Sequence, residues 1–449
     1  MGEWGSALRW SEVPAPVAQR LRLVLIDVLG VMLVGARDPE QQRLVAAWDL
    51  LPGPSPIVGG GRLTSVESAA WLNAAALVRL ELDEGNKYAK GHPAAHGFPA
   101  VLALAAAKDS PGEELLASLL AAYEVASRFG RSTTLRPGLH PHGSWGVPGA
   151  AAGCARLLRL DGDATAAAID TASGMPVAAH FSSALDGNRV RDAWMGAANL
   201  AGLSAARMAS AGAATNTGTA ALSLGEILGT FDPKRLTEGL GERWDVELGY
   251  FKQHAACSFT HPAADAIIAL RESGDLPAPA AIDGVTVETH SLAAGLDRRT
   301  WTNQLSAMFS VPFVVAAAAV HGSVRPEVSS EEALARADVQ RLAERVEVVG
   351  AADLDARLPA ERPVRVTVHA GDQRRVVERP NPVGDSAFQP FDEDRLVQVL
   401  CKLLGAAEPV EQVVRVVDAV FDGRSGEVLQ TLAAAAVPPP TEPRHAAQL

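Results

Sequence analysis

Apolar positions recur at helical spacing through most of the first 250 residues. The pattern predicts helices over residues 17–34, 66–82, 100–107, 115–127, 149–158 and 166–172. Alanine and glycine are abundant in several of these segments, as in GAAAGCARLL at 149–158 and in the stretch 195–214. The side chains at a contact set how closely two helices approach, so this part of the chain predicts a compact bundle of many helices.

The pattern changes to strand-like alternation after about residue 275. Residues 282–290, 345–349 and 364–378 alternate, and Gly371-Asp372 divides the last run as a hairpin turn. Apolar residues at helical spacing predict helices between these runs, at 306–319 and 330–342, and again after them, at 392–404, 410–420 and 426–436. We expect a mainly α fold. A large all-helical domain of residues 1–255 and 393–449 is interrupted by a smaller α+β domain of residues 256–392. The Pro-rich segment 437–449 is expected to fray.

Composition narrows the class of protein. The 449 residues are 48% hydrophobic, which supplies a large core, and the net charge of −12 argues against a nucleic acid partner. Three widely spaced cysteines argue against a disulfide framework or a zinc ribbon. No secretory signal is visible, and the apolar run 21–34 is too short and too charged to span a bilayer. We therefore expect a cytoplasmic protein with no membrane contact.

The first chemical motif places three carboxylates, two lysines and two histidines within residues 81–97. Titratable groups beside Gly and Pro suggest a loop that presents side chains into a cleft. A carboxylate such as Asp83 near His92 sets the histidine tautomer and suits it to act as a general base. Glu81 and Lys90 are candidate substrate ligands in the same loop. The alternative is a solvated, charged helix end.

The second motif places His140 and His142 among three glycines, before the alanine-rich segment 149–158. Such a segment can present imidazole and backbone N–H groups to an anion near a helix N-terminus. We take His140 as an acid/base candidate and His142 as a substrate ligand. Two histidines at this spacing supply only two metal ligands, and no HExxH or third partner at standard spacing is present. We therefore expect no metal.

Two further motifs supply cations. Arg191 precedes a long small-residue segment and can bind a carboxylate bidentately, although a surface charge at a helix start is equally consistent. Lys252 and His261 flank Cys257 near the predicted domain boundary, where ligand clefts are common. They can bind an acidic substrate or transfer protons, whereas a free cysteine is more often a packed small hydrophobe. The sequence contains no GxGxxG at a strand–helix turn, no phosphate loop and no GxSxG, which argues against nucleotide cofactors and serine hydrolase chemistry.

Taken in order, these motifs resemble the MmgE/PrpD family, which includes 2-methylcitrate dehydratase, cis-aconitate decarboxylase and iminodisuccinate epimerase. The resemblance runs from the segment at 27–35 to Asn381-Pro382 and the C-terminal helices. It rests on the acidic run 80–84, His92-Pro93, Gly138-Leu139-His140, the Lys252–Cys257–His261 run and Phe309-Ser310-Val311-Pro312.

The resemblance implies an all-helical domain with a smaller α+β lid, a homodimer, and neither a metal nor an organic cofactor. It also implies proton abstraction next to a carboxylate of a small substrate, followed by loss of water, loss of CO₂ or return of the proton. Three positions depart from the family pattern: Arg191 replaces a lysine of the decarboxylases, Phe313 replaces a tyrosine, and Gly85 replaces a threonine. Arginine stays protonated and phenylalanine lacks the hydroxyl donor, so the departures argue against cis-aconitate decarboxylase itself.

These observations favour a cofactor-independent hydro-lyase acting on a small di- or tricarboxylate. His92 and His140 are the acid/base candidates, Asp83 orients a histidine, and Lys252, His261 and Arg191 bind carboxylates and stabilise enolate charge. His261 is also a candidate for proton transfer. An epimerase needs the same acid/base pair, so it remains an alternative. A binding homologue without catalysis and a decarboxylase are the other possibilities.

Overall fold

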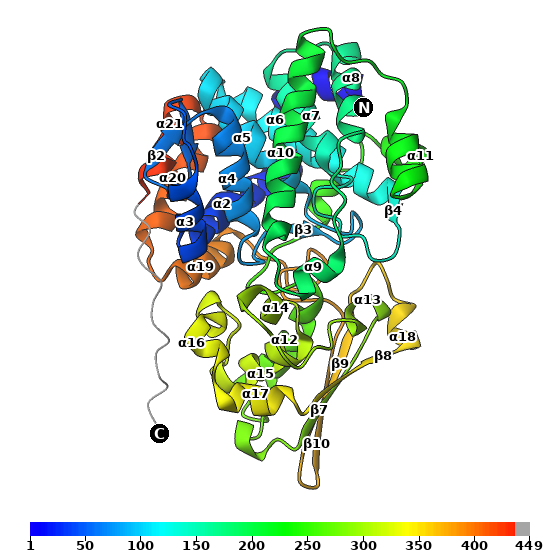
Figure 1. The fold of residues 1–449 in the computed structure, drawn as a ribbon, viewed down its shortest axis with the longest axis vertical. Helices are drawn as coiled ribbons and strands as arrows, with labels where there is room; N and C mark the ends of the chain where they lie inside the picture. Colours follow the sequence, from blue (N-terminus) through cyan, green and yellow to red (C-terminus); the bar gives the residue numbers. More distant parts are fainter. Residues whose placement is uncertain (436–449) are drawn as a thin grey trace.

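The computed structural model describes residues 1–435, and these form a helical part and a sheet-bearing part (Figure 1). The helical part occupies the upper half of Figure 1. Its N-terminal helices are α1 (Gly2–Ala7), α2 (Ala15–Ala36), α3 (Pro39–Ala47), α4 (Val66–Val78), α5 (Pro93–Lys108), α6 (Gly112–Ser132), α7 (Val147–Leu157), α8 (Gly162–Ser173), α9 (Phe181–Leu185), α10 (Val190–Ser210) and α11 (Lys234–Thr237). Each segment predicted as helical in this region overlaps one of these helices, so those predictions are confirmed.

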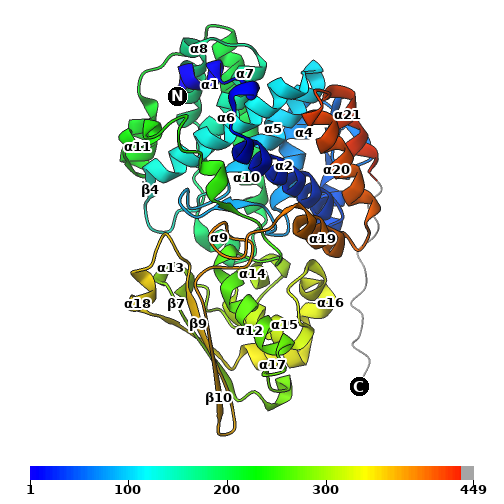
Figure 2. The same cartoon turned by 180° about the vertical axis from the view of Figure 1, so that it is seen from behind.

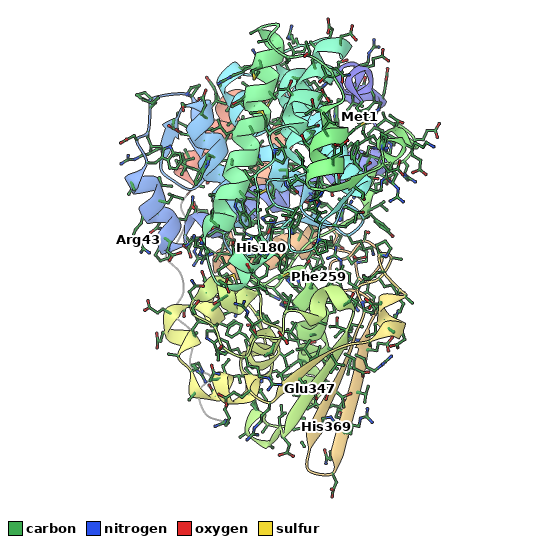
Figure 3. All side chains as sticks on the ribbon, turned by 45° about the vertical axis from the view of Figure 1, so that its right-hand side comes forward. Met1, Arg43, His180, Phe259, Glu347 and His369 are labelled. Atoms are coloured by element: carbon green, nitrogen blue, oxygen red, sulfur yellow. The ribbon has the colours of Figure 1, made fainter. Side chains whose placement is uncertain are left out.

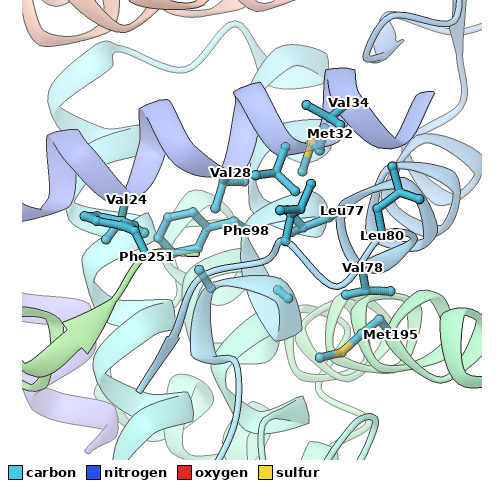
Figure 4. Close-up of a cluster of buried hydrophobic side chains, with 14 of the residues drawn as sticks. Val24, Val28, Met32, Val34, Leu77, Val78, Leu80, Phe98, Met195 and Phe251 are labelled. Carbon is cyan, nitrogen blue, oxygen red and sulfur yellow. The ribbon is translucent and has the colours of Figure 1, made fainter. Parts of the chain in front are cut away.

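The core of the helical part is built from helices α4, α5, α6, α7 and α10, which pack against one another. Small residues allow the close approaches: a Cβ added at Gly202 of α10 would lie 2.4 Å from the Cβ of Ala150 in α7. Helix α2 runs across this group, and Figure 4 shows Val24 and Val28 of α2 beside Phe98 of α5 and the ring of Phe251. Phe251 thereby anchors the segment that carries Lys252.

Three two-stranded ladders lie among the helices. They pair β1 (Ser55–Ile57) with β2 (Arg62–Thr64), β3 (Gly85–Asn86) with β6 (Gly249–Tyr250), and β4 (Thr133–Leu135) with β5 (Gly229–Phe231). The purely helical prediction for the first 250 residues missed these ladders, because strands of two or three residues are too short to show an alternating pattern.

The sheet-bearing part follows the helical part in sequence. Its four-stranded sheet has the order β10-β9-β7-β8, with bounds β7 (Gly284–Thr289), β8 (Val346–Gly350), β9 (Val364–Ala370) and β10 (Gln373–Arg379). Strands β9 and β10 are antiparallel with Ala370 opposite Gln373, so Gly371-Asp372 forms the predicted two-residue turn. Val285 and Val287 are buried as the alternation predicts. The helices are α12 (His261–Glu272), α13 (Ser291–Ala294), α14 (Gln304–Met308), α15 (Val311–His321), α16 (Glu331–Leu334), α17 (Ala337–Ala343) and α18 (Ala352–Asp355).

The last helices return to the helical part, as Figure 2 shows from behind. They are α19 (Glu393–Leu404), α20 (Glu408–Phe421) and α21 (Gly426–Gln430), and both α19 and α20 pack on α2. Arg22 of α2 pairs with Glu393 at 2.7 Å and with Asp418 at 2.8 Å, which fixes both helices to it. The Pro-rich segment 437–449 lies outside the described residues. None of the helices in residues 1–435 has the length and apolarity that crossing a bilayer requires.

Two local predictions for the sheet-bearing part were wrong. The segment 306–319 is not one helix, because Ser310 starts α15 by accepting a hydrogen bond from the Phe313 N–H at 3.0 Å. The segment 330–342 is likewise divided into α16 and α17, and Ser330 caps the first of them. Ser310 thus starts a new helix inside a run of apolar residues, whereas α17 begins after Arg336, which makes no side-chain capping hydrogen bond.

Candidate active site

A short ladder joins the acidic loop after α4 to Lys252, 169 positions away from Asp83 in sequence. Gly85 of β3 pairs with Tyr250 of β6, and Asn86 pairs with Gly249. Lys252 follows β6 by two residues, and its Nζ lies 3.3 Å from Asp83 Oδ1 and 3.6 Å from Glu81 Oε2. The ladder thus brings a buried cation to two carboxylates that the sequence places in another motif.

Gly85 is required by the same ladder. A Cβ at this position would lie 2.3 Å from the Tyr250 hydroxyl oxygen and 2.4 Å from the ring carbon that bears it. The phenol of Tyr250, which is buried, therefore fills the space that a side chain at position 85 would need. This contact gives a physical reason for one of the three departures from the family pattern.

Asp83 is an ionised carboxylate at the centre of this arrangement. Its Oδ2 lies 3.1 Å from His92 Nδ1, and its Oδ1 faces Lys252 and, at 4.0 Å, the Arg191 guanidinium. Burial raises the pKa of a carboxyl group, but the nearby His92 ring and the charges of Lys252 and Arg191 outweigh it and lower the pKa of Asp83 to about 2. Burial likewise opposes the charge on Lys252, and Asp83 and Glu81 overcome this and raise its pKa.

His92 stands immediately before α5 with one ring nitrogen committed. Its Nδ1 lies 2.6 Å from the carbonyl oxygen of Glu84. A carbonyl only accepts hydrogen bonds, so Nδ1 carries the proton and Nε2 keeps a free lone pair. Burial is the main cause that lowers the pKa of His92, to about 3, so the ring is neutral near pH 7. His92 is therefore held as a base whose reactive atom is Nε2.

His140 has the opposite arrangement. Its Nδ1 accepts a hydrogen bond from the His142 backbone N–H at 3.1 Å, so the proton of the neutral ring resides on Nε2. Burial lowers the pKa of His140 well below its usual value. The ring lies between Phe181 and Trp194, with both centroid distances at 5.2 Å. Phe181 begins α9 directly after His180, which Figure 3 marks near the junction of the two parts. His140 therefore presents an Nε2–H donor beside apolar rings.

His142 lies between the two acid/base candidates. Its ring centroid is 5.1 Å from that of His92 and 4.5 Å from that of His140, and both contacts are edge-to-face. The ring is buried, and its Nδ1 has no hydrogen-bond partner among the described residues. The two histidines of the second motif and His92 of the first thus converge in one cluster.

Asp83, His92 and His142 offer three ligand atoms within 4.8 Å of one another, which is a possible metal-ligand set. The sequence analysis missed this third partner because Asp83 and His92 lie in a different motif. However, Lys252 and Arg191 already balance the charges of Asp83 and Glu81, so the set offers a divalent metal no unpaired negative charge. The charge balance around the set therefore disfavours a divalent metal.

Arg191 enters the cluster from the first turn of α10. It pairs with Glu81 and donates to the Val78 carbonyl at the end of α4, and its side chain is fully buried. Its Nε has no hydrogen-bond partner among residues 1–435. Glu81 has a φ of 55°, a left-handed conformation that is unfavourable for a residue with a side chain and is common at functional sites. Two carboxylates, Glu81 and Asp83, thus balance two cations, Arg191 and Lys252.

Three residues singled out in the sequence lie elsewhere. Lys90 is exposed, and its Nζ donates to the Thr133 carbonyl at 2.7 Å. His261 begins α12, where its Nε2 donates to the Ala256 carbonyl at 2.9 Å and its ring contacts His254 at 5.1 Å. Phe313 packs edge-on against Trp301 inside the sheet-bearing part, at a centroid distance of 4.9 Å. Among the described residues, none of these three contacts Asp83 or His92 through a hydrogen bond, an ion pair or a ring contact.

Glu84 and Tyr123 support the cluster, and the sequence analysis gave them no role. The Glu84 carboxylate accepts the Tyr123 hydroxyl at 2.6 Å and the Ala94 N–H at 3.3 Å, while its backbone carbonyl accepts His92 Nδ1–H. Glu84 therefore holds both the ring of His92 and the first turn that follows it. Burial raises the pKa of Glu84 to about 7. Only the acidic run hinted at Glu84, and nothing in the helical pattern indicated Tyr123.

His96 orients the second motif. Its Nδ1 donates to the His92 carbonyl at 2.9 Å, and its Nε2 accepts the Gly143 N–H at 3.2 Å. Both nitrogens are occupied, so His96 positions backbone and has no free atom for proton transfer.

The cluster is closed to solvent in this structure. His92 is its most exposed member at 8%, and Arg191 and Asp83 are at 0%. A substrate can reach these groups only if neighbouring segments move. Exclusion of water strengthens every charge interaction inside such a site once it closes.

Comparisons with known proteins identify the family of this chain. The MmgE/PrpD N-terminal domain model matches residues 1–233, and the C-terminal domain model matches residues 254–422. A cis-aconitate decarboxylase of Aspergillus terreus is 27% identical over 285 residues, which cover 59% of this chain and 58% of that protein. A cis-aconitate decarboxylase-like protein, oryM, of Aspergillus oryzae is 28% identical over 296 residues, 60% of each chain. The match thus spans under two thirds of these relatives. Because the two family models together cover most of its length, the chain belongs to the MmgE/PrpD family.

Proposed function

We propose that this protein is a lyase that removes a proton next to a carboxylate of a small di- or tricarboxylate and then expels hydroxide as water. The observation that carries the proposal is the pair of opposite histidine tautomers. His92 offers a free lone pair at Nε2, and His140 offers a proton at Nε2. One cluster therefore holds a base and an acid that are both neutral, and a β-elimination of water needs one of each.

Each step has a residue in this cluster. His92 Nε2 takes the proton from the carbon beside the carboxylate, and the imidazolium that forms lies 3.1 Å from the ionised Asp83. Lys252 and the free Nε of Arg191 bind the substrate carboxylates and stabilise the negative charge that develops on them. His140 gives its Nε2 proton to the departing hydroxyl, which leaves as water. The products are an alkene, water and a protein in which His92 carries one extra proton and His140 lacks one. The proton must therefore return from His92 to His140 before the next turnover.

Other candidate ligands of the cluster are Glu81 and His142. Glu81 pairs with both cations, and burial raises its pKa, so it can take up a proton when a substrate carboxylate replaces it. His142 has a free Nδ1 between the two acid/base residues. The exposed Lys90 lies apart from this group, and the role of His261 stays a prediction.

Epimerisation is a second candidate reaction, because the same two nitrogens can remove a proton from one face and return one to the other. Decarboxylation is the activity of the Aspergillus terreus relative, and it is less compatible with Arg191 than the elimination is. The residue at 191 matters because a guanidinium binds carboxylates but does not transfer protons. A homodimer with a movable α+β lid over residues 256–392 is part of the same proposal.

Proton NMR in D₂O with a panel of hydroxy-, imino- and unsaturated polycarboxylates tests the proposal. We expect new vinylic signals with the wild-type protein and at least about 100-fold slower formation with His92→Ala or His140→Ala. Deuterium incorporation without a new product would support the epimerase instead. Loss of CO₂ would support a decarboxylase. Unchanged turnover in both variants would contradict the assigned roles of the two histidines.

A further inference from the structure

A cavity lies beside Gln253 and His254, the two residues that follow Lys252 in the chain. It has a volume of about 560 Å³ and is bordered by α12, α19, the end of β10 and the stretch after α15. None of the residues around it belongs to the polar cluster of Asp83, His92 and His140.

Four cationic side chains converge on this cavity. Arg325 follows α15, Arg379 ends β10, and Arg395 and Lys402 stand two turns apart on α19. Among residues 1–435, none of the four forms an ion pair with a carboxylate. Arg395 donates to the Gln253 side chain at 3.3 Å, and Arg325 reaches only the Lys402 carbonyl, at 3.5 Å. The chain has an excess of acidic residues, so the missing partners do not reflect a shortage of carboxylates.

The buried carboxylate at the cavity wall is already satisfied. Asp265 Oδ1 accepts from His254 Nε2 at 2.9 Å and from Gln253 at 3.0 Å, while its Oδ2 accepts the Val383 N–H at 2.8 Å. Glu272, the other carboxylate there, is exposed at the rim. The cavity therefore keeps a positive excess that its own residues do not neutralise.

We propose that this cavity binds a small multivalent anion that carries several phosphate or carboxylate groups. Guanidinium groups bind both kinds of oxyanion in a bidentate manner, and lysine adds a point charge. Sites for small molecules usually enclose about 300–1,000 Å³, so the volume suits a metabolite better than a single inorganic ion. The site does not depend on the reaction proposed for the polar cluster.

Isothermal titration calorimetry at low ionic strength tests this proposal with two probes, inorganic pyrophosphate and tricarballylate. The variant Arg379→Gln/Arg395→Gln removes two charges from the cavity. The control Arg341→Gln/Arg374→Gln removes two exposed arginine charges that lie outside the cavity and form no ion pair within residues 1–435. We expect binding to the wild type, at least about 10-fold weaker binding to the cavity variant, and affinity within about two-fold in the control. Added NaCl should weaken binding in all three proteins.

The tighter probe identifies whether the ligand carries phosphate or carboxylate groups. Failure of both probes to bind the wild type overturns the proposal. Equal affinity for the wild type and the cavity variant also overturns it, since the anion then binds elsewhere. Circular dichroism of the variants confirms that they are folded before the affinities are compared.

Discussion

Replacing Asp83 by asparagine removes one of the two carboxylates that balance two buried cations. Lys252 Nζ lies 3.3 Å from Asp83 Oδ1, and Arg191 lies 4.0 Å from the same oxygen. At an effective dielectric constant of about 20, two unit charges 3.3 Å apart attract each other by about 5 kcal/mol. Part of this attraction offsets desolvation, and removing one partner of a buried pair typically costs about 3–5 kcal/mol. We expect Asp83→Asn to lower the free energy of unfolding by that amount.

The double variant Asp83→Asn/Lys252→Met separates folding from catalysis. It restores the charge balance, with Glu81 facing Arg191 alone, so most of the lost stability should return and a deficit of about 1 kcal/mol should remain. Turnover should stay at least about 100-fold below wild type in both variants, because each lacks the carboxylate beside His92. Urea unfolding followed by tryptophan fluorescence measures the first effect, and product formation by NMR measures the second.

A small stability loss would refute this reasoning. If Asp83→Asn lowers the free energy of unfolding by less than about 1 kcal/mol, the cations are not held by Asp83 as the contacts indicate. If the double variant is no more stable than the single variant, charge imbalance is not the cause of the loss.

Three further predictions concern the surroundings of the cluster. Tyr123→Phe leaves the Glu84 carboxylate without its 2.6 Å donor and should lower the free energy of unfolding by about 1–3 kcal/mol. The loss should be larger at about pH 8 than at about pH 5. The pKa of Glu84 is about 7, and its ionised form depends more strongly on the hydroxyl donor. The kcat/KM of the wild type should stay level between about pH 5 and 8 and fall only toward the pKa of His92, about 3, as the base of the free enzyme becomes protonated. A fall in kcat/KM near pH 6.5 would contradict a buried, neutral His92. Gly85→Ala should lower the free energy of unfolding by about 1–3 kcal/mol, because the added methyl group clashes with Tyr250. Adding Tyr250→Phe should restore part of the lost stability. An unchanged urea midpoint in Gly85→Ala would show that the contact relaxes freely.

The secondary structure could be predicted where the apolar residues of a helix or strand recur with its period. The long helices α2 and α6 and the hairpin of β9 and β10 match the periodicity of their apolar residues. The break before α15 could not be predicted, because apolar residues continue on both sides of Ser310 and only the cap reveals the new helix. Helix α4 also ends at Val78, earlier than its apolar pattern, because the chain leaves it to form the acidic loop.

The residue types of the site could be predicted, but their arrangement could not. The motifs pointed to Asp83, His92, His140 and Lys252, and the structure brings these side chains into one cluster with His142 and Arg191. The ladder of β3 and β6 that joins the motifs is only two residues long, so periodicity does not reveal it. The tautomers depend on a backbone carbonyl and a backbone N–H, which every residue has, so no sequence pattern marks them.

The central claim is that His92 is a base and His140 an acid before any substrate binds. Solid-state ¹⁵N NMR of protein labelled only at histidine tests this claim directly, because protonated and unprotonated ring nitrogens give separate signals. Spectra of His92→Gln and His140→Gln assign the two rings. At neutral pH we expect the proton on Nδ1 of His92 and on Nε2 of His140. The opposite tautomer at either ring, or a doubly protonated His92, would contradict the account.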